Sequence, residues 1–292
     1  MTGKIISVVN MKGGVGKTTM TCNLAYELRE DYKVLVIDID PQFNSTQAFI
    51  NLKHEGFDKY FDLKEKNLTI AEIFNEKRSK QIVKRNELTE EEFYKEIIHK
   101  IDNNLDIIPG DLELIVDINA NSDDKLKAFF NTLNLVEKYD FIFFDCPPTW
   151  SHLTNLAIGI SDYYLIPSKL DDFSAIGIDI LLEKNTGKVK ANPDKYPVCL
   201  GVIYTFLNPR ATEGTSTGDK LTTFKESLND IYSLHEDGVK CKISPFNTTI
   251  NYSQPIATKS IIYDKLENKY SILKDNVKNI KSELIERLNG GE

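Results

Sequence analysis

A glycine-rich segment near the N-terminus carries residue types that bind phosphate. It reads KGGVGKTT over Lys12–Thr19 and stands between a β-branched run, Lys4–Val9, and apolar residues at helical spacing over Lys17–Glu30. Glycines let backbone N–H groups turn inward around phosphate oxygens, and the positive end of a helix favours the same anion. In such a loop Lys17 would reach the β- and γ-phosphates, and the Thr18 hydroxyl would bind Mg²⁺. The pattern therefore predicts a nucleotide phosphate site.

Two residues separate this loop from the common P-loop pattern. Met11 stands where that pattern has its first glycine, five positions before Gly16. Lys12 is a second lysine, five residues before Lys17, and its stem begins on the other side of the turn. A lysine placed there could reach a nucleotide held by a second copy of the chain. The alternatives are a glycine turn without a ligand and a solvated Lys12, but strand, loop, Lys–Thr pair and helix together favour a phosphate site.

Acidic residues end two other predicted strands. Asp38 and Asp40 end the run KVLVIDID, and Asp145 follows four apolar residues in FIFFD. Ligands of open α/β sheets bind at the carboxyl ends of strands, where carboxylates can hold Mg²⁺ and orient an attacking water. An aspartate that caps a turn before Pro147 is the plain alternative for one site. Two such sites beside a phosphate loop predict a magnesium and water-positioning site.

Strands that alternate with helices must position these residues. Short apolar runs predict strands at Lys4–Val9, Lys33–Ile39, Leu105–Pro109, Phe141–Asp145, Tyr163–Pro167 and Cys199–Thr205. With helical patterns between most of them, the fold class is α/β, a doubly wound, mainly parallel twisted sheet flanked by helices, as in P-loop NTPases. We expect a single P-loop ATPase domain over residues 1–292. It would carry a helical surface insertion at about 51–104 and a C-terminal helical segment at about 260–290.

Composition excludes several classes of protein. The 292 residues are 41% hydrophobic and 27% charged, which is typical of a globular protein that can bury a substantial core. No apolar run of about 18 residues and no signal-peptide profile occurs, so we expect a cytoplasmic chain with no membrane partner. The four cysteines form no CxxC pair, which disfavours zinc ribbons, iron–sulfur carriers and disulfide frameworks. The net charge of −8 requires any nucleic-acid contact to come from a local patch.

Together these motifs resemble the deviant-Walker ATPases of the ParA/MinD superfamily, and the ParA type in particular. The resemblance rests on KGGVGKTT and on two further segments, DIDPQFNST (Asp38–Thr46) and FFDCPP (Phe143–Pro148). It continues in SDYYLIPSKLDDFSAIGI (Ser161–Ile178) and in SPFNTTINYSQPIATKSIIYD (Ser244–Asp264). The motifs stand in the order of the family and cover nearly the whole chain.

The resemblance implies an ATP site and a role for each lysine. Lys12 is similar to the signature lysine that contacts the other subunit's ATP in a sandwich dimer, and Lys17 to the ordinary P-loop lysine. Thr19 would contact the α-phosphate, while Pro245 and Asn247 would pack against and hydrogen-bond the adenine. The complete implied ATP-binding set is Lys12, Gly13, Gly14, Val15, Gly16, Lys17, Thr18, Thr19, Pro245 and Asn247.

The acids and the magnesium follow from the same resemblance. Asp40 is similar to the acid that positions or activates the attacking water, so Lys12, Lys17 and Asp40 are the implied catalytic residues. Thr18 would bind Mg²⁺ directly, and Asp38 and Asp145 would organise it through waters. ATP and Mg²⁺ are the expected cofactors.

The DNA-binding surface of the family is matched only in part. Phe246 stands where chromosomal relatives carry arginine, whereas Arg210 and Lys259 match basic positions of the family. From Lys240 to the C-terminus nine basic residues, Lys242 among them, stand against six acidic ones. This excess favours contact with DNA phosphates, although lysines on a solvated helix face are the alternative.

These observations predict a slow, partner-stimulated ATPase that dimerises with ATP, binds duplex DNA nonspecifically and drives plasmid or chromosome partition. The expected partners are a second copy of the chain, DNA and a ParB-like centromere-binding protein, with the chain on the nucleoid when ATP is bound. The alternatives are a MinD-like membrane-associated ATPase, an ATPase that positions a cargo other than DNA, a binding switch with negligible turnover, and a metabolic kinase or ligase. The stripe Val277, Ile280, Leu284 and Leu288 lacks an aromatic residue and favours packing on the chain's own domain over a membrane-binding helix.

Overall fold

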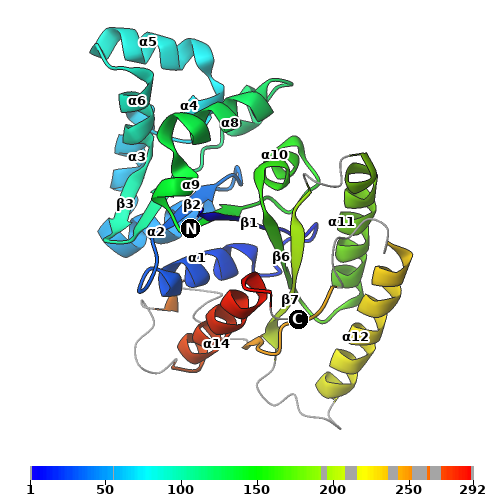
Figure 1. Ribbon diagram of the computed structural model, residues 1–292. Coiled ribbons are helices and arrows are strands. Elements are labelled where there is room, and N and C mark those ends of the chain that lie inside the picture. The colour runs from blue at the N-terminus through cyan, green and yellow to red at the C-terminus, as the bar shows by residue number, and fades with distance from the viewer. Residues whose placement is uncertain are drawn as a thin grey trace.

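Eight strands form one sheet at the centre of the computed structural model, which describes residues 2–54, 56–191, 196–207, 216–235, 243–251, 262–263 and 271–290 (Figure 1). The strand order is β3-β4-β2-β5-β1-β6-β7-β8, and only β3 and β4 pair antiparallel among these strands. The strands are β1 (Lys4–Val8), β2 (Val34–Asp38), β3 (His99–Asp102), β4 (Leu105–Ile108), β5 (Phe141–Asp145), β6 (Tyr163–Ser168), β7 (Val198–Leu207) and β8 (Ile250–Asn251). The predicted mainly parallel α/β sheet is confirmed.

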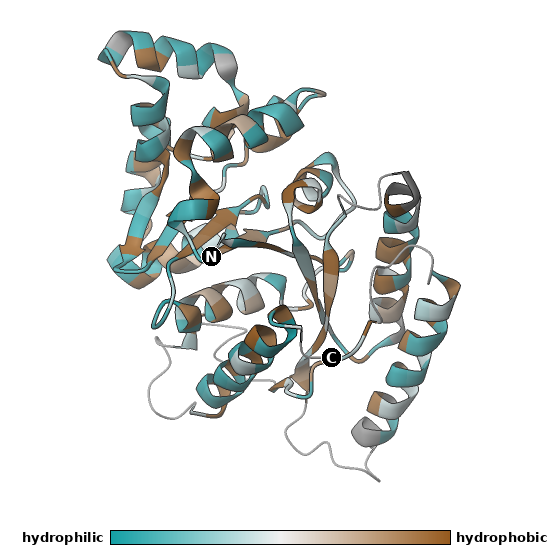
Figure 2. Ribbon diagram, in the orientation of Figure 1, coloured by the Kyte–Doolittle hydropathy of each residue, from teal (hydrophilic) through white to brown (hydrophobic). Residues whose placement is uncertain are grey.

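Helices cover both faces of the sheet, so each central strand is apolar on both sides. In β1, Ile5 packs into the core shared with α10 (His152–Ile160) and α11 (Asp172–Ala191). Ile6 packs into the core shared with α1 (Lys17–Leu28) and α14 (Ser271–Leu288). Figure 2 shows the same arrangement, with apolar strands inside and hydrophilic outer helix surfaces. The described helices are α1 (Lys17–Leu28), α2 (Asn44–His54), α3 (Asp58–Glu65), α4 (Ala71–Phe74), α5 (Glu76–Asn86), α6 (Glu90–Ile97), α7 (Leu114–Asp117), α8 (Ser122–Leu133), α9 (Leu135–Lys138), α10 (His152–Ile160), α11 (Asp172–Ala191), α12 (Ser216–Leu234) and α14 (Ser271–Leu288).

The stretch expected as a helical insertion is not helical throughout. Helices α3 to α6 lie together with α8 at one end of the sheet, at the upper left of Figure 1. Strand β3 also falls within residues 51–104, and it pairs antiparallel with β4 at the sheet edge. Only Asn103 and Asn104 separate these two strands, and two-residue loops are the commonest connection in a β-hairpin. The expectation of helices alone was wrong at this edge.

The C-terminal helix α14 packs on α1 through the stripe that the sequence singled out. Val277, Ile280 and Leu284 are fully buried, and Leu288 is packed against the same core. The interpretation as a core-packing helix is confirmed. Of the residues predicted to begin this helix near residue 260, 260–261 and 264–270 lie outside the described part. Within the described residues, none of the helices combines the length and apolarity needed to cross a bilayer.

Candidate nucleotide site

The glycine loop between β1 and α1 has a backbone conformation that other residue types would adopt only with strain. Gly14 (φ 69°) and Gly16 (φ 88°) both lie in the left-handed region, and Gly16 is the N-cap residue that directly precedes α1. A Cβ on Gly16 would also stand 3.3 Å from the ring of Phe206. From β7 the Thr205 hydroxyl donates to the Val15 carbonyl at 2.7 Å and fixes the loop to the sheet. Thr205 is a supporting residue that no motif in the sequence indicates.

Lys17 is held inside this loop. Its Nζ donates to the backbone carbonyls of Asn10 at 3.1 Å and of Lys12 at 2.9 Å, and its side chain is buried. Burial lowers the pKa of Lys17, and the nearby carboxylate of Asp145 opposes that shift. The ammonium therefore lies between the glycine loop and the acids, as a phosphate-binding lysine requires.

The Lys12 side chain extends toward the start of α11. Its Nζ lies 2.5 Å from Asp171 Oδ1 and 3.4 Å from the Ser174 hydroxyl, and 5.7 Å from the centre of the Phe173 ring. The side chains of Lys12 and Asp171 are 28% and 37% exposed, so the ion pair stands at the surface. The structure thus replaces the alternative of a solvated lysine with an intramolecular ion pair. Asp171 lies inside a segment that the sequence singled out, but no spacing links it to Lys12.

Asp38 and Asp145 lie directly opposite each other at the ends of β2 and β5, and both are fully buried. Thr46 donates to Asp38 from its backbone N–H at 2.8 Å and its hydroxyl at 2.7 Å. The Thr21 hydroxyl donates to Asp145 Oδ1 at 3.3 Å, but Asp145 Oδ2 has no hydrogen-bond partner among the described residues. Burial raises the pKa of both carboxyls; the negative charge of Asp38 raises the pKa of Asp145 further, and that of Asp40 raises the pKa of Asp38.

This carboxylate pair has the chemistry of a cation site. Two buried acids with an unpartnered oxygen are costly unless a positive charge compensates them. Thr18 stands close enough that its hydroxyl lowers the pKa of Asp145, and Lys17 acts in the same direction by its charge. The pair and the loop together fit a divalent cation beside phosphate oxygens.

Asp40 lies beside the pair on the chain that leaves β2. It is 6% exposed, and its Oδ1 accepts the Gln42 N–H at 2.9 Å. Its own N–H donates to Asp38 Oδ1 at 3.3 Å. Asp40 also interacts electrostatically with Lys17 and Asp145. The structure therefore brings Lys17, Thr18 and the three acids to one edge of the sheet.

Two groups of predicted residues remain, those expected to contact adenine and those expected to contact DNA. Pro245 pairs with Val202 of β7, and the exposed Asn247 donates its N–H to Glu283 on α14. Phe246, between them, is 2% exposed, with the guanidinium of Arg287 4.0 Å from its ring centre. It is a core residue that contributes nothing to a binding surface. The candidate DNA-binding residues Arg210, Lys242 and Lys259 lie outside the described residues.

Comparisons with known proteins agree with this fold. Residues 3–195 match the family model AAA_31, described as an AAA domain. The chain is 34% identical to an uncharacterized protein of Methanocaldococcus jannaschii over 206 residues, 68% of this chain and 72% of that protein. It is 28% identical to the chromosome partitioning protein ParA of Myxococcus xanthus over 215 residues, 72% of this chain and 67% of that protein.

A solved structure extends the likeness over the full length. It is the structure of a protein described as a plasmid partition protein from Borrelia burgdorferi bound to AMPPNP, with a TM-score of 0.64 and 24% identity. It covers 99% of this chain and 98% of that one. The fold and the glycine loop define a P-loop NTPase. Because the family model spans most of the chain, this protein belongs to the AAA_31 family, and its resemblance to the ParA/MinD superfamily is confirmed.

Proposed function

We propose that the chain is an ATPase that binds ATP and Mg²⁺, closes into a homodimer and positions plasmid or chromosomal DNA. The observation that carries the proposal is the convergence of the glycine loop with two facing buried carboxylates. Mg²⁺ commonly binds through one or two carboxylates together with phosphate oxygens and water. The unpartnered oxygen of Asp145 and the neighbouring Asp38 supply such a pair, and Thr18 adds a hydroxyl.

Hydrolysis would be carried out by residues already in place. When bound, Mg²⁺ would neutralise charge that develops on the phosphates. Lys17 would bind the β- and γ-phosphates in place of the carbonyls of Asn10 and Lys12 that it now contacts. Asp40, held by the Gln42 N–H, would orient the attacking water. The surrounding loop N–H groups would fix the triphosphate against it.

Dimerisation is supported by the surface beside Lys12. Phe173 is 74% exposed and Ile176 is 53% exposed, and they stand three residues apart on α11, next to the Lys12–Asp171 ion pair. An exposed apolar stripe of this kind commonly marks an interface. A second copy that covered this face would bring Lys12 toward the nucleotide of its partner. Lys12 would exchange a surface ion pair, which is worth at most about 1 kcal/mol, for a phosphate contact.

A second candidate function, the positioning of a cargo other than DNA, is favoured by the C-terminal helix. Lys281 pairs with Asp31 at 2.6 Å, and Arg287 pairs with Glu283 at 2.8 Å. Asp31 lies outside the counted segment, so its pair with Lys281 lowers the positive excess there by one charge. Glu283 is already in the count, so the Arg287 pair leaves the excess unchanged. The positive charge left for DNA phosphates is thus smaller than the sequence count implies.

Nucleotide-dependent DNA binding distinguishes the two functions. We expect the chain with ATP and Mg²⁺ to retain random-sequence duplex DNA in filter binding, to lose it steeply as salt rises, and to bind much more weakly with ADP. The Lys17→Ala variant is the matched control, because it should lose nucleotide and DNA binding together. An ATP-dependent dimer that binds no DNA at low salt would contradict the DNA function and support the second candidate.

A further inference from the structure

A cavity of about 640 Å³ lies among α4, α5, α6 and α8, in the part of the chain for which the sequence assigned no role. Its lining includes the buried Ile73 and Tyr94 and the half-buried Val83 and Leu88. Its volume is in the range of pockets that hold small ligands or a few peptide side chains. The lining therefore offers an apolar wall to an entering group.

A buried acid, Glu72, also lines this cavity. It is 1% exposed, and its Oε1 lies 2.6 Å from Arg78 Nε. Its other oxygen, Oε2, is buried without a hydrogen-bond partner among the described residues. A buried carboxylate oxygen without a donor is costly. A ligand that brings a charged donor would remove that cost.

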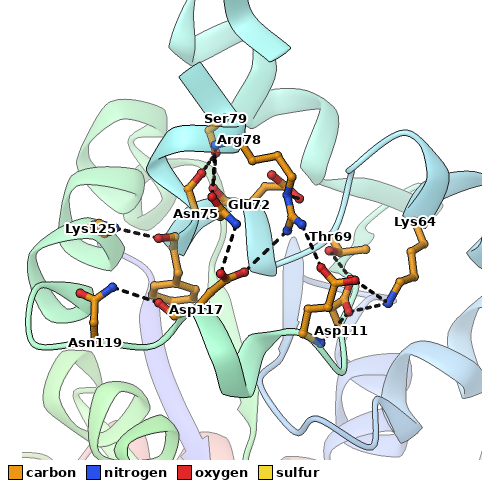
Figure 3. Close-up of polar contacts among 12 residues, drawn as sticks. Lys64, Thr69, Glu72, Asn75, Arg78, Ser79, Asp111, Asp117, Asn119 and Lys125 are labelled. Atoms are coloured by element: carbon orange, nitrogen blue, oxygen red, sulfur yellow. Dashed lines mark hydrogen bonds and ion pairs between the residues drawn. The ribbon is translucent and has the colours of Figure 1, made fainter. Parts of the chain in front are cut away.

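The ion-pair network around Glu72 has too little positive charge to satisfy it (Figure 3). Arg78 is shared with two further acids, at 2.8 Å from Glu113 and 3.6 Å from Asp117. That Asp117 oxygen has no hydrogen bond among the described residues, and Asn75 donates to the other one at 3.1 Å. The second cation, Lys64, lies 3.6 Å from Glu113 but is bound to Asp111 at 2.8 Å, so two cations face four carboxylates. The net charge at this end of the cavity favours a cation.

We propose that this cavity binds a peptide segment of a partner protein, in which an arginine or lysine next to an apolar residue fills the site. The apolar side chain would pack on Ile73, Val83 and Leu88, and the cationic group would donate to Glu72 Oε2. The exposed rim is balanced in charge, because two lysines stand there with two glutamates, Lys80, Lys84, Glu87 and Glu90. Lys125 also lines the cavity, and its Nζ donates to the Phe74 carbonyl at 2.7 Å. The site is separate from the glycine loop, and the proposal stands whether or not the chain hydrolyses ATP.

Saturation-transfer-difference NMR on the full chain at pH 8, without nucleotide, tests the proposal. At that pH the Glu72 carboxyl, whose pKa burial raises to about 7, is ionised. The probes are the tripeptide acetyl-Leu-Arg-Leu-amide and two analogues in which citrulline or glutamate replaces arginine. Citrulline keeps the shape of arginine but not its charge. Because citrulline keeps N–H donors but loses the positive charge that strengthens the hydrogen bond to the carboxylate, we expect the citrulline peptide to bind about tenfold more weakly than the arginine peptide, and the glutamate peptide more weakly still. Equal binding of arginine and citrulline peptides, tighter binding of the glutamate peptide, or no binding of the arginine peptide would overturn the proposal.

Three variants locate the site. Glu72→Gln should remove the preference for arginine over citrulline, whereas Glu87→Gln, the same change at the exposed rim, should leave it within about twofold. Val83→Trp adds bulk to the apolar wall of the cavity and leaves both residues of the Glu72–Arg78 ion pair unsubstituted, and it should abolish binding of all three peptides. The Val83→Trp variant still tests the location of the site if Glu72→Gln does not fold. A preference that survives Glu72→Gln, or binding that survives Val83→Trp, would contradict the assignment.

Discussion

Replacing Glu72 by glutamine tests whether burial or ion pairing determines the pKa of its carboxyl group. Burial raises the pKa of Glu72 from 4.5 to about 7, against the opposing effect of Arg78 and with Asp117 and Asp111 adding to the rise. Between these two pH values the unfolded chain releases the proton while the folded chain keeps it. Rising pH therefore favours the unfolded state, and the wild type should lose about 3 kcal/mol of unfolding free energy that the Glu72→Gln variant keeps.

The assay is urea unfolding of wild type and variant between pH 4.5 and pH 8, followed by circular dichroism and by tryptophan fluorescence. The free-energy difference between the two proteins is the informative quantity, because other titrating groups largely cancel in it. The variant should gain on the wild type as pH rises, and the gain should level off above about pH 7. A constant difference would refute the raised pKa. A wild type that instead gains on the variant with rising pH would show that Arg78 dominates over burial.

Three further substitutions test the site and the core. Asp145→Asn should raise the unfolding free energy of the nucleotide-free chain by about 1–3 kcal/mol, because it removes a buried carboxyl. The same variant should weaken Mg²⁺-dependent ATP binding at least about tenfold. Thermal unfolding with and without Mg²⁺ and ATP measures both effects. Asp40→Ala should leave ATP binding intact and slow single-turnover hydrolysis at least about a hundredfold, so unchanged turnover would refute its role in orienting water. Phe246→Ala should cost about 3–5 kcal/mol of unfolding free energy, and a loss below about 1 kcal/mol would contradict its burial under Arg287.

Local rules in the sequence were sufficient for the elements around the loop. The β-branched run before the glycines and the apolar spacing after them predict β1 and α1 almost to the residue, because both elements depend on near neighbours. Phe141–Asp145 is likewise a strand over the predicted bounds. The facing of Asp38 and Asp145 could be anticipated, since the carboxyl ends of parallel strands meet at one edge.

Long-range contacts could not be anticipated in the same way. Lys12 and Asp171 are 159 residues apart, and neither residue type predicts the other. Phe246 is aromatic in a polar segment, and its burial depends on Arg287, which lies on another element. Glu72 has the residue type of a surface helix, and it is buried only because α4 packs against α8 and Arg78 approaches it. Such residues require the tertiary packing itself.

Sedimentation velocity of wild type and Lys12→Ala with ADP, and then with a nonhydrolysable ATP analogue and Mg²⁺, tests the account most directly. The account predicts a wild-type monomer with ADP and a dimer with the analogue. Lys12→Ala should remain a monomer with both nucleotides while still binding the analogue. A wild type that stays monomeric with the analogue, or a Lys12→Ala variant that dimerises with it, would contradict the account.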